Sequence, residues 1–334
     1  SCGGSSGGAG GITAKASFPH IALGESTGGS IVSPAAFCGV FGLCPTYGRV
    51  SRYGLMDYAN SLDKIGPLGQ NIYDTALLLE TISGFDGNES TTISKPIDDY
   101  AKFANNKNNP LKNIKIGIVK ESFKNINKNI EKNVHDGIDK LKENGVKAEE
   151  ISLKFPIEHG LSTYYILATS EASTNLAKYC GMRYGVNDKL KGNFNEYFTK
   201  VRSSNLGAEA KRRIILGTFA RMSGYRDAYY IKATKVRAKI VNEYKKMFKK
   251  YDILISPTAP ILPPKFSEIE KLSPLRNYMM DIMTVGPNLA GLPHISINIS
   301  ENNDLPIGLM ITGDHFQESK IIQLAANIEK MFSD

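Results

Sequence analysis

The sequence is poor in the residues that build metal sites and disulfide frameworks. Its 334 residues include only four cysteines and five histidines. Cys2, Cys38, Cys44 and Cys180 show no Cys-x-x-Cys spacing, and the histidines form no ligand motif. We therefore expect no metal site and no structural disulfide, and we interpret the cysteines as the reduced thiols of a cytoplasmic protein.

Long apolar segments are also missing. No apolar run approaches the roughly 20 residues of a transmembrane helix, and no signal peptide is evident. The sequence therefore gives no indication of membrane insertion. Hydrophobic residues nevertheless make up 41% of the chain, which is enough for a large core.

Acidic residues are outnumbered by basic ones, 33 to 41, and the net charge is +8. A basic protein suits an anionic partner such as a nucleic acid. The lysines, however, are spread through Lys/Asn-rich stretches such as 105–115 and 124–132, and no RNA-reading motif is present. We expect a diffuse attraction for phosphate rather than a dedicated reading surface.

What the chain does have is two glycine–serine clusters close together, Gly3 to Gly8 and Thr27 to Ser30. Glycine lets a ligand approach main-chain N–H groups closely. Runs of this kind are often linkers. A linker does not fit here, because residues 31–43 form an apolar and small-residue stretch typical of a packed interior. The spacing favours one site built from two loops.

Two familiar glycine-rich loops are excluded. A phosphate-binding P-loop needs Gly-Lys-Ser/Thr after its glycines, and no such triplet is present. The nucleophile elbow Gly-x-Ser-x-Gly of the α/β-hydrolases is also absent around Ser30.

Strands interleaved with helices predict an α/β fold with a sheet sandwiched between helices. A chain of this length could form two domains, but we expect one, residues 1–334. We expect residues 12–22 to pack the two clusters together and 88–110 to form a polar loop. Helices are predicted at 73–83, 126–141, 163–178 and 209–248, and strands at 114–119, 148–153, 252–256, 294–299 and 307–312.

Several segments together resemble the amidase signature family, and the resemblance covers nearly the whole chain. They are the two clusters, Pro34 to Gly39, Pro45 to Gly54, Ser61 to Pro67, Ala210 to Phe219, Ser223 to Tyr230, Asn288 to Pro293 and Leu305 to Leu309. The last five are most similar to the glutaminase components of the tRNA-dependent amidotransferases, a branch of that family. The resemblance implies an α/β/α sandwich with a mixed central sheet.

The resemblance also implies a Ser–cis-Ser–Lys catalytic triad. Ser30 matches the nucleophile and Ser5 the cis-serine, with Ser6 in a supporting role unless the two exchange places. Thr27, Gly28 and Gly29 would contribute the N–H groups of an oxyanion hole. Ser30 as a simple helix N-cap is compatible with this interpretation.

For the substrate, the resemblance implies that glutamine is held by three side chains. Arg213, or its neighbour Arg212 if the register differs by one, would bind the α-carboxylate with help from Tyr164. Asp281 would take the α-amino group.

Some family residues are missing from this chain. The family's lysine lies upstream of the first serine loop, and since the chain begins at Ser1 inside that loop we expect an N-terminally truncated fragment. Ser26 and Val32 stand where an Asp and an Arg are usual, a joint loss typical of a removed ion pair. Cys44 stands where Lys is usual.

The implied activity is that of a glutaminase supplying ammonia for the ATP-dependent conversion of Glu-tRNA(Gln) or Asp-tRNA(Asn). The implied partners are a B subunit, which would bind most of the tRNA and use ATP and Mg²⁺, and a small C subunit. This chain would bind no cofactor itself. A free-standing amidase acting on small amides and a non-catalytic assembly component are the alternatives.

Overall fold

The computed structural model describes residues 1–105, 114–300 and 305–333. Within these residues the strands form one eight-stranded sheet. Its order is β1 (Ile21–Ser26), β3 (Lys64–Gly69), β2 (Phe41–Cys44), β7 (His294–Asn298), β8 (Gly308–Gly313), β6 (Ile253–Pro257), β4 (Lys115–Val119) and β5 (Lys147–Ile151).

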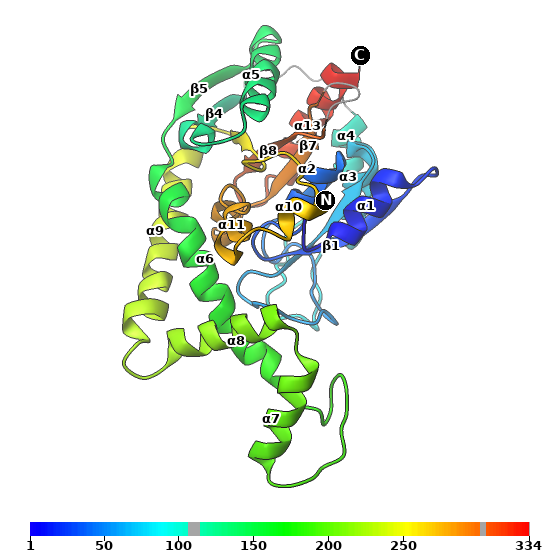
Figure 1. Ribbon diagram of the computed structural model, residues 1–334. Helices are drawn as coiled ribbons and strands as arrows, with labels where there is room; N and C mark the ends of the chain where they lie inside the picture. The colour runs from blue at the N-terminus through cyan, green and yellow to red at the C-terminus, as the bar shows by residue number, and fades with distance from the viewer. Residues whose placement is uncertain (106–113, 301–304, 334) are drawn as a thin grey trace.

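The sheet is mixed, as the family resemblance implies. β4 runs parallel to both of its neighbours, β5 and β6, and the other adjacent pairs are antiparallel. Strands from the two ends of the chain meet in the middle, where Cys44 of β2 pairs with His294 of β7. Both faces of the sheet are covered by helices (Figure 1).

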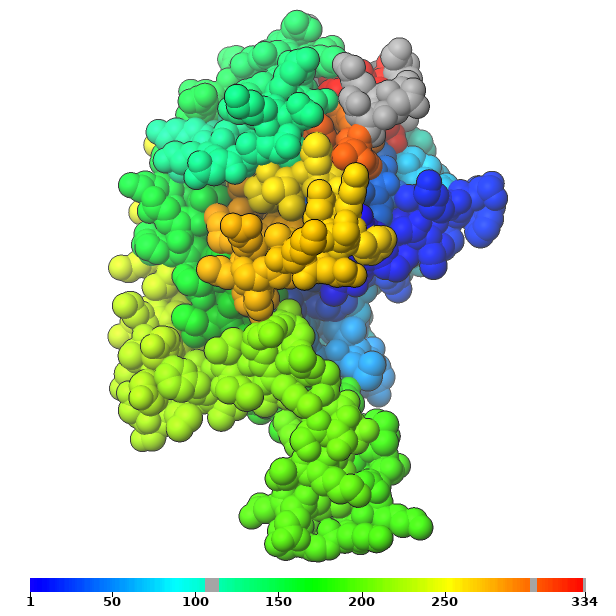
Figure 2. Space-filling model, in the orientation of Figure 1, coloured from blue at the N-terminus to red at the C-terminus, as the bar shows by residue number. Residues whose placement is uncertain are grey.

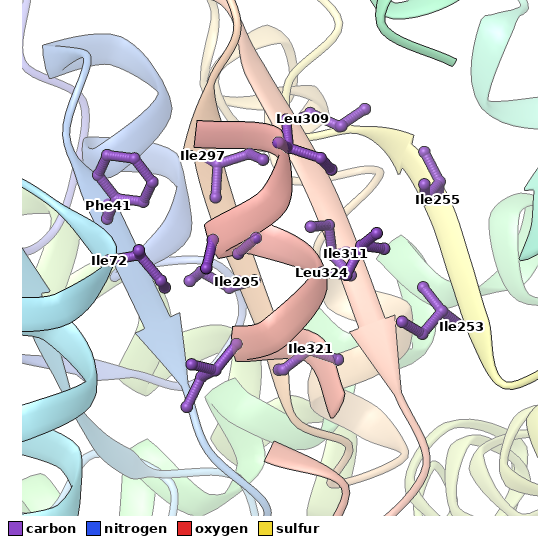
Figure 3. Close-up of a cluster of buried hydrophobic side chains, with 14 of the residues drawn as sticks. Phe41, Ile72, Ile253, Ile255, Ile295, Ile297, Leu309, Ile311, Ile321 and Leu324 are labelled. Atoms are coloured by element: carbon purple, nitrogen blue, oxygen red, sulfur yellow. The ribbon is translucent and has the colours of Figure 1, made fainter. Parts of the chain in front are cut away.

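One face carries the larger hydrophobic core. Ile253 and Ile255 of β6 point into it together with Ile311 of the adjacent strand β8 and Ile295 of β7, which pairs with β8 (Figure 3). The helices that close this core are α3 (Ile72–Ile82), α4 (Tyr100–Asn105), α5 (Lys128–Glu143) and α13 (Glu318–Ser333). Leu254, between the two β6 isoleucines, points to the opposite face, as the period of two in a strand requires.

The opposite face holds the segments that form the candidate site. Its helices are α2 (Val32–Cys38), α6 (Lys154–Asn175), α9 (Lys232–Phe248) and α12 (Val285–Leu289). The remaining helices are α1 (Gly7–Lys15), α7 (Phe194–Asn205), α8 (Ala208–Arg221), α10 (Phe266–Ile269) and α11 (Pro274–Met279), with short helical turns η1 (Lys120–Phe123), η2 (Leu176–Lys178) and η3 (Asp227–Ile231). In Figure 2, α7 and the chain around it, in green, project from the body.

Three of the sequence predictions are wrong in detail. The helix expected over 209–248 is broken between Met222 and Arg226, where Gly224 has a φ of 86° that an α-helix does not allow. Helix α6 starts at Lys154, nine residues before the predicted start. The loop predicted over 88–110 contains α4, which is held by the buried side chain of Tyr100; the rest of that loop from 106 on lies outside the described residues.

Among the described residues, no helix is both long and apolar enough to cross a bilayer. The same part of the chain has no group of three His, Cys, Asp or Glu side chains placed to hold a metal ion.

Candidate active site

Residues 3–6 of the first glycine–serine cluster form a loop, and the last two residues of the cluster, Gly7 and Gly8, begin α1. The peptide bond between Gly4 and Ser5 is cis, which confirms the conformation that the family resemblance implies. Ser5 is exposed, whereas Ser6 is half-buried and ties the loop to β1. The Ser6 hydroxyl donates to the Glu25 carbonyl over 3.1 Å and accepts from the Glu25 N–H over 3.2 Å. These contacts suit a supporting role for Ser6.

The second cluster connects the end of β1 to α2, and the carbonyl groups of its last three residues are all fixed. Asn288 Nδ2 donates a hydrogen bond to the Gly28 carbonyl over 2.9 Å. The Ser33 N–H donates to the Gly29 carbonyl over 2.8 Å, and the Ser6 N–H donates to the Ser30 carbonyl over 3.1 Å. Within the described chain, the N–H groups of Gly28, Gly29 and Ser30 have no protein acceptor. A loop fixed through its carbonyls with its N–H groups unused is the arrangement that an oxyanion hole needs.

Neither glycine of this loop has room for a side chain. A Cβ on Gly28 would lie 2.5 Å from Cζ of Tyr164, and one on Gly29 would lie 2.3 Å from Oγ1 of Thr284. Only glycine allows the loop to pass this close to α6 and to the residue that precedes α12. The close packing explains why the sequence has Gly-Gly before Ser30.

Tyr164 lies behind the loop rather than in the open part of the site. Its side chain is 5% exposed, and its hydroxyl forms a 2.8 Å hydrogen bond with Oγ1 of Thr27. Burial raises the pKa of Tyr164 well above its usual value, so the phenol stays protonated. In this structure Tyr164 packs against the second serine loop, and the neighbouring Tyr165 lines the cavity described next.

A cavity of about 560 Å³ opens beside the first loop, and the residues that line it include none of residues 27–30. It is bounded by Gly3 and Gly4 of the first loop, by Ser33 of α2, by α8 and by the segment that carries α10 and α11. That segment, yellow to orange in Figures 1 and 2, lies beside the N-terminus, whose amino group donates to the Pro264 carbonyl over 2.7 Å. The volume lies in the range of small-molecule sites.

Arg213 lines this cavity and is held by its neighbours. Its Nε donates to Oε1 of Glu209 over 2.8 Å, and Nη1 donates to the Tyr58 hydroxyl over 3.0 Å. The guanidinium also lies over the Tyr58 ring, 5.4 Å from its centre. Tyr278 donates a further hydrogen bond to Glu209 over 2.8 Å. These contacts fix the plane of the guanidinium, and among the described residues Nη2 has no hydrogen-bond partner.

Asp281 lines the same cavity. Its Oδ2 accepts a 3.0 Å hydrogen bond from the Tyr165 hydroxyl. Burial raises the pKa of Asp281 to about 6, opposed by the Tyr165 hydrogen bond and by Arg213. A buried carboxylate with one neutral partner is suited to bind a cationic group. The structure thus brings Arg213 and Asp281 to one cavity.

A cluster of buried polar side chains packs against the second serine loop. Asn288, which binds the Gly28 carbonyl, is 3.3 Å from Nε2 of His294 and accepts from the Cys44 thiol over 3.6 Å. Burial lowers the pKa of His294 well below its usual value, so the ring is neutral. Lys64 lies beside Cys44 and donates to the Leu292 carbonyl over 3.0 Å, and burial lowers its pKa. Position 44 has a cysteine where the family usually has a lysine, but the side chain of Lys64, on the adjacent strand β3, lies beside it.

Three further points concern the contact between the two serines, the replaced ion pair and the residues that the sequence did not indicate. The triad that the resemblance implies would place the Ser5 and Ser30 hydroxyls within hydrogen-bond reach, and the described residues show no hydrogen bond between them. Ser26 and Val32, which replace an expected ion pair, are both fully buried. Sequence reasoning missed Glu209 and Tyr165. The spacing of four residues between Glu209 and Arg213 on one helix is the signal that would have indicated the first.

Known proteins match this chain over nearly its whole length. Residues 1–322 match the family model described as Amidase. The A subunit of a glutamyl-tRNA(Gln) amidotransferase from Halothermothrix orenii is 46% identical over 98% of this chain and 68% of its own, and the one from Sulfolobus acidocaldarius is also 46% identical, with the same coverage. The crystal structure of the corresponding Thermotoga maritima protein has a TM-score of 0.80 at 36% identity, covering 98% of this chain and 66% of that one. This chain thus spans about two thirds of the length of these relatives.

Proposed function

This chain belongs to the amidase signature family of enzymes, and from that premise we propose that it is the glutaminase part of a tRNA-dependent amidotransferase. The observation that carries the proposal is the single cavity in which Arg213, Asp281 and the first serine loop meet. The names of the relatives at 43–47% identity supply the reaction class.

The geometry supports the following division of labour. The α-carboxylate of glutamine binds Arg213, and its α-ammonium binds Asp281, leaving the side-chain carboxamide to reach the serine loops. Ser30 attacks the carboxamide carbon, and the N–H groups of the second loop stabilise the negative oxygen. Loss of ammonia leaves an acyl-enzyme, which water converts to glutamate. In the family a lysine is the base: through Ser5 it would take the proton of the Ser30 hydroxyl and return it to the leaving nitrogen, and we assign no residue of this chain to that role.

The fate of the ammonia determines the partners. Protonation at pH 7 removes the lone pair that ammonia needs as a nucleophile, so release into water would waste it. A B subunit, together with a small C subunit, would therefore receive the ammonia inside the complex, use ATP with Mg²⁺, and hold most of the tRNA. This chain would bind no cofactor, and the complex would act in the cytoplasm.

The proposal is tested first at Arg213. Lysine keeps the charge but loses the planar fork that grips a carboxylate, so Arg213→Lys is expected to raise the KM for glutamine about 10- to 100-fold with a smaller effect on kcat. Steady-state glutaminase kinetics of the full-length protein with its partner subunits measure this. The matched control is Arg212→Lys, since Arg212 also pairs with Glu209. The assignment falls if Arg212→Lys raises KM and Arg213→Lys does not.

A second test uses pH. Asp281 must be ionised to hold the ammonium of glutamine, and its pKa of about 6 is high for an aspartate. Glutaminase kcat/KM is therefore expected to be constant well above pH 6 and to decline as the pH falls through about 6, because the carboxylate takes up a proton. In Asp281→Asn, kcat/KM should be lower than in wild type at high pH and should no longer fall through about pH 6. The same decline in the variant would assign it to another group.

A further inference from the structure

Tyr278 contacts side chains of the candidate site that come from two different helices. It lies on α11, and it lines the cavity together with Arg213 and Asp281. Its hydroxyl donates to Oε1 of Glu209 on α8, and its ring stacks on that of Tyr165 on α6. The reaction steps described above use neither contact.

The first contact leads to the arginine that would bind the carboxylate. The Tyr278 hydroxyl and Nε of Arg213 both donate to the same oxygen, Oε1 of Glu209, and each hydrogen bond is 2.8 Å long. The other carboxylate oxygen, Oε2, pairs with the more exposed Arg212. Hydrogen bonds to a charged group are stronger than those between neutral groups. Tyr278 therefore holds the Glu209 carboxylate in the orientation that fixes the guanidinium of Arg213.

The second contact leads to the aspartate that would bind the ammonium group. The ring centres of Tyr278 and Tyr165 are 3.9 Å apart, and the rings are inclined by 23°. The Tyr165 hydroxyl donates to Oδ2 of Asp281 over 3.0 Å, and the Asp281 N–H donates to the Tyr278 carbonyl over 3.1 Å. A stacked ring cannot turn far without losing its packing. Tyr278 therefore fixes the phenol that orients the Asp281 carboxylate.

The head group of glutamine carries a negative and a positive charge at a fixed separation. Two binding groups select for that separation only if they are themselves held at a fixed distance from each other. Tyr278 contacts the partner of Arg213 and the partner of Asp281. Resting on the proposed function, we propose that Tyr278 is a positioning residue that holds Arg213 and Asp281 in one frame, which selects the head group of an α-amino acid.

Tyr278→Phe tests the first contact in the full-length protein with its partner subunits. It removes the hydroxyl and keeps the stacked ring, so it is expected to raise the KM for glutamine about 5-fold and to leave kcat within about 2-fold. In a Glu209→Ala background the same substitution should change KM by less than about 2-fold, since its acceptor is already absent. The matched control is Tyr251→Phe, which removes a tyrosine hydroxyl that donates to Glu149 over 2.6 Å and does not line the cavity. It should leave both constants unchanged.

Tyr278→Leu also removes the stack, so its effect should reach Asp281. The groups that face Asp281 are Tyr164 and Tyr165 of α6 and Arg213 of α8, and Tyr165 supplies the hydrogen bond. A hydrogen bond to a carboxylate lowers its pKa, so weakening this bond raises the pKa of Asp281. The decline of kcat/KM with falling pH should therefore begin at a higher pH than in wild type. In Tyr278→Phe the decline should stay near pH 6.

A second substrate reports on the head group. Glutaramate is glutamine without its α-amino group, so it can use Arg213 but has nothing for Asp281 to bind. Well above pH 6, the preference for glutamine over glutaramate should fall about 5-fold in Tyr278→Leu. In Tyr278→Phe it should stay within about 2-fold, because both substrates need Arg213.

An unchanged KM in Tyr278→Phe, or a loss of kcat as large as the rise in KM, would overturn the inference. An effect of Tyr278→Phe that is equally large without Glu209 would overturn it too, as would a Tyr278→Leu variant with the pH profile and the substrate preference of wild type. In all these cases the proposed function would stand. If Tyr278→Leu does not fold, Tyr278→Phe and its double variant decide the question. A wild-type complex that does not hydrolyse glutamine would instead refute the proposed function, and this inference with it.

Discussion

Ser30→Ala is expected to lower the glutaminase activity of the assembled full-length protein by at least about 10⁴-fold, because removing a nucleophile leaves only binding and the oxyanion hole to assist water. The structure places Ser30 at the end of a loop whose last three carbonyls are hydrogen-bonded and whose N–H groups, within the described chain, are free. The variant keeps this loop, so glutamine should still bind. Steady-state kinetics and a glutamine-binding measurement separate the two effects.

A bypass assay makes the result specific. Ammonium chloride supplied from outside should restore amidation of the charged tRNA in the Ser30→Ala complex, since only the source of ammonia is lost. Ser203→Ala, a serine on the projecting helix α7 whose hydroxyl donates to carbonyls of its own helix, is the matched control and should retain full activity. Residual activity above about a tenth of wild type would rule out Ser30 as the nucleophile.

Gly217→Ala should have the largest effect on stability. Gly217 lies on α8 where that helix crosses α6, and a Cβ there would be 1.9 Å from the main-chain oxygen of Thr169. Backbone cannot move aside as a flexible side chain can, so the two helices must separate. Overpacking of this kind lowers the free energy of unfolding by about 3 kcal/mol. The better helix propensity of alanine raises it by about 1 kcal/mol. We expect a net loss of about 2 kcal/mol in the free energy of unfolding, measured from the denaturant midpoint.

The same substitution should also weaken glutamine binding, because α8 carries Arg213 one turn before Gly217. The control is Gly207→Ala, at the N-cap of the same helix, where a Cβ meets nothing within 4 Å. It should stay within about 0.5 kcal/mol of wild type. If both variants unfold at the same denaturant concentration as wild type, the close crossing of α6 and α8 is incorrect.

The sequence predicted best those elements whose pattern depends only on their own residues. The amphipathic helix α5, with Ile130, Val134, Ile138 and Leu141 on one side, was predicted to within two residues at each end. The sequence did not predict β1, β2 and β3, because these short strands contain glycine and polar residues and are defined by pairing with distant partners. The break after α8 was missed because the helical pattern resumes in α9.

The candidate site divides in the same way. The two serine loops could be found from the sequence because each has a glycine-rich motif. In the second loop the glycines are required, because a side chain there would clash with Tyr164 or Thr284. Pairings across long sequence separations were not accessible. Nothing local indicates that Tyr58 would face Arg213 across 155 residues, or that Asn288 would hold the carbonyl of Gly28 from 260 residues away.

The central pairing of β2 with β7 has a consequence for how the protein is made. A ribosome adds about 5–20 residues per second. The partner of Cys44 on β7 lies about 250 residues further along the chain, so the serine loops leave the ribosome roughly 12–50 s before that partner strand exists. During this interval β2 has an open edge where β7 will later pair, a recognised hazard for misassembly. Misassembly through this edge is therefore expected mainly between the synthesis of β2 and that of β7.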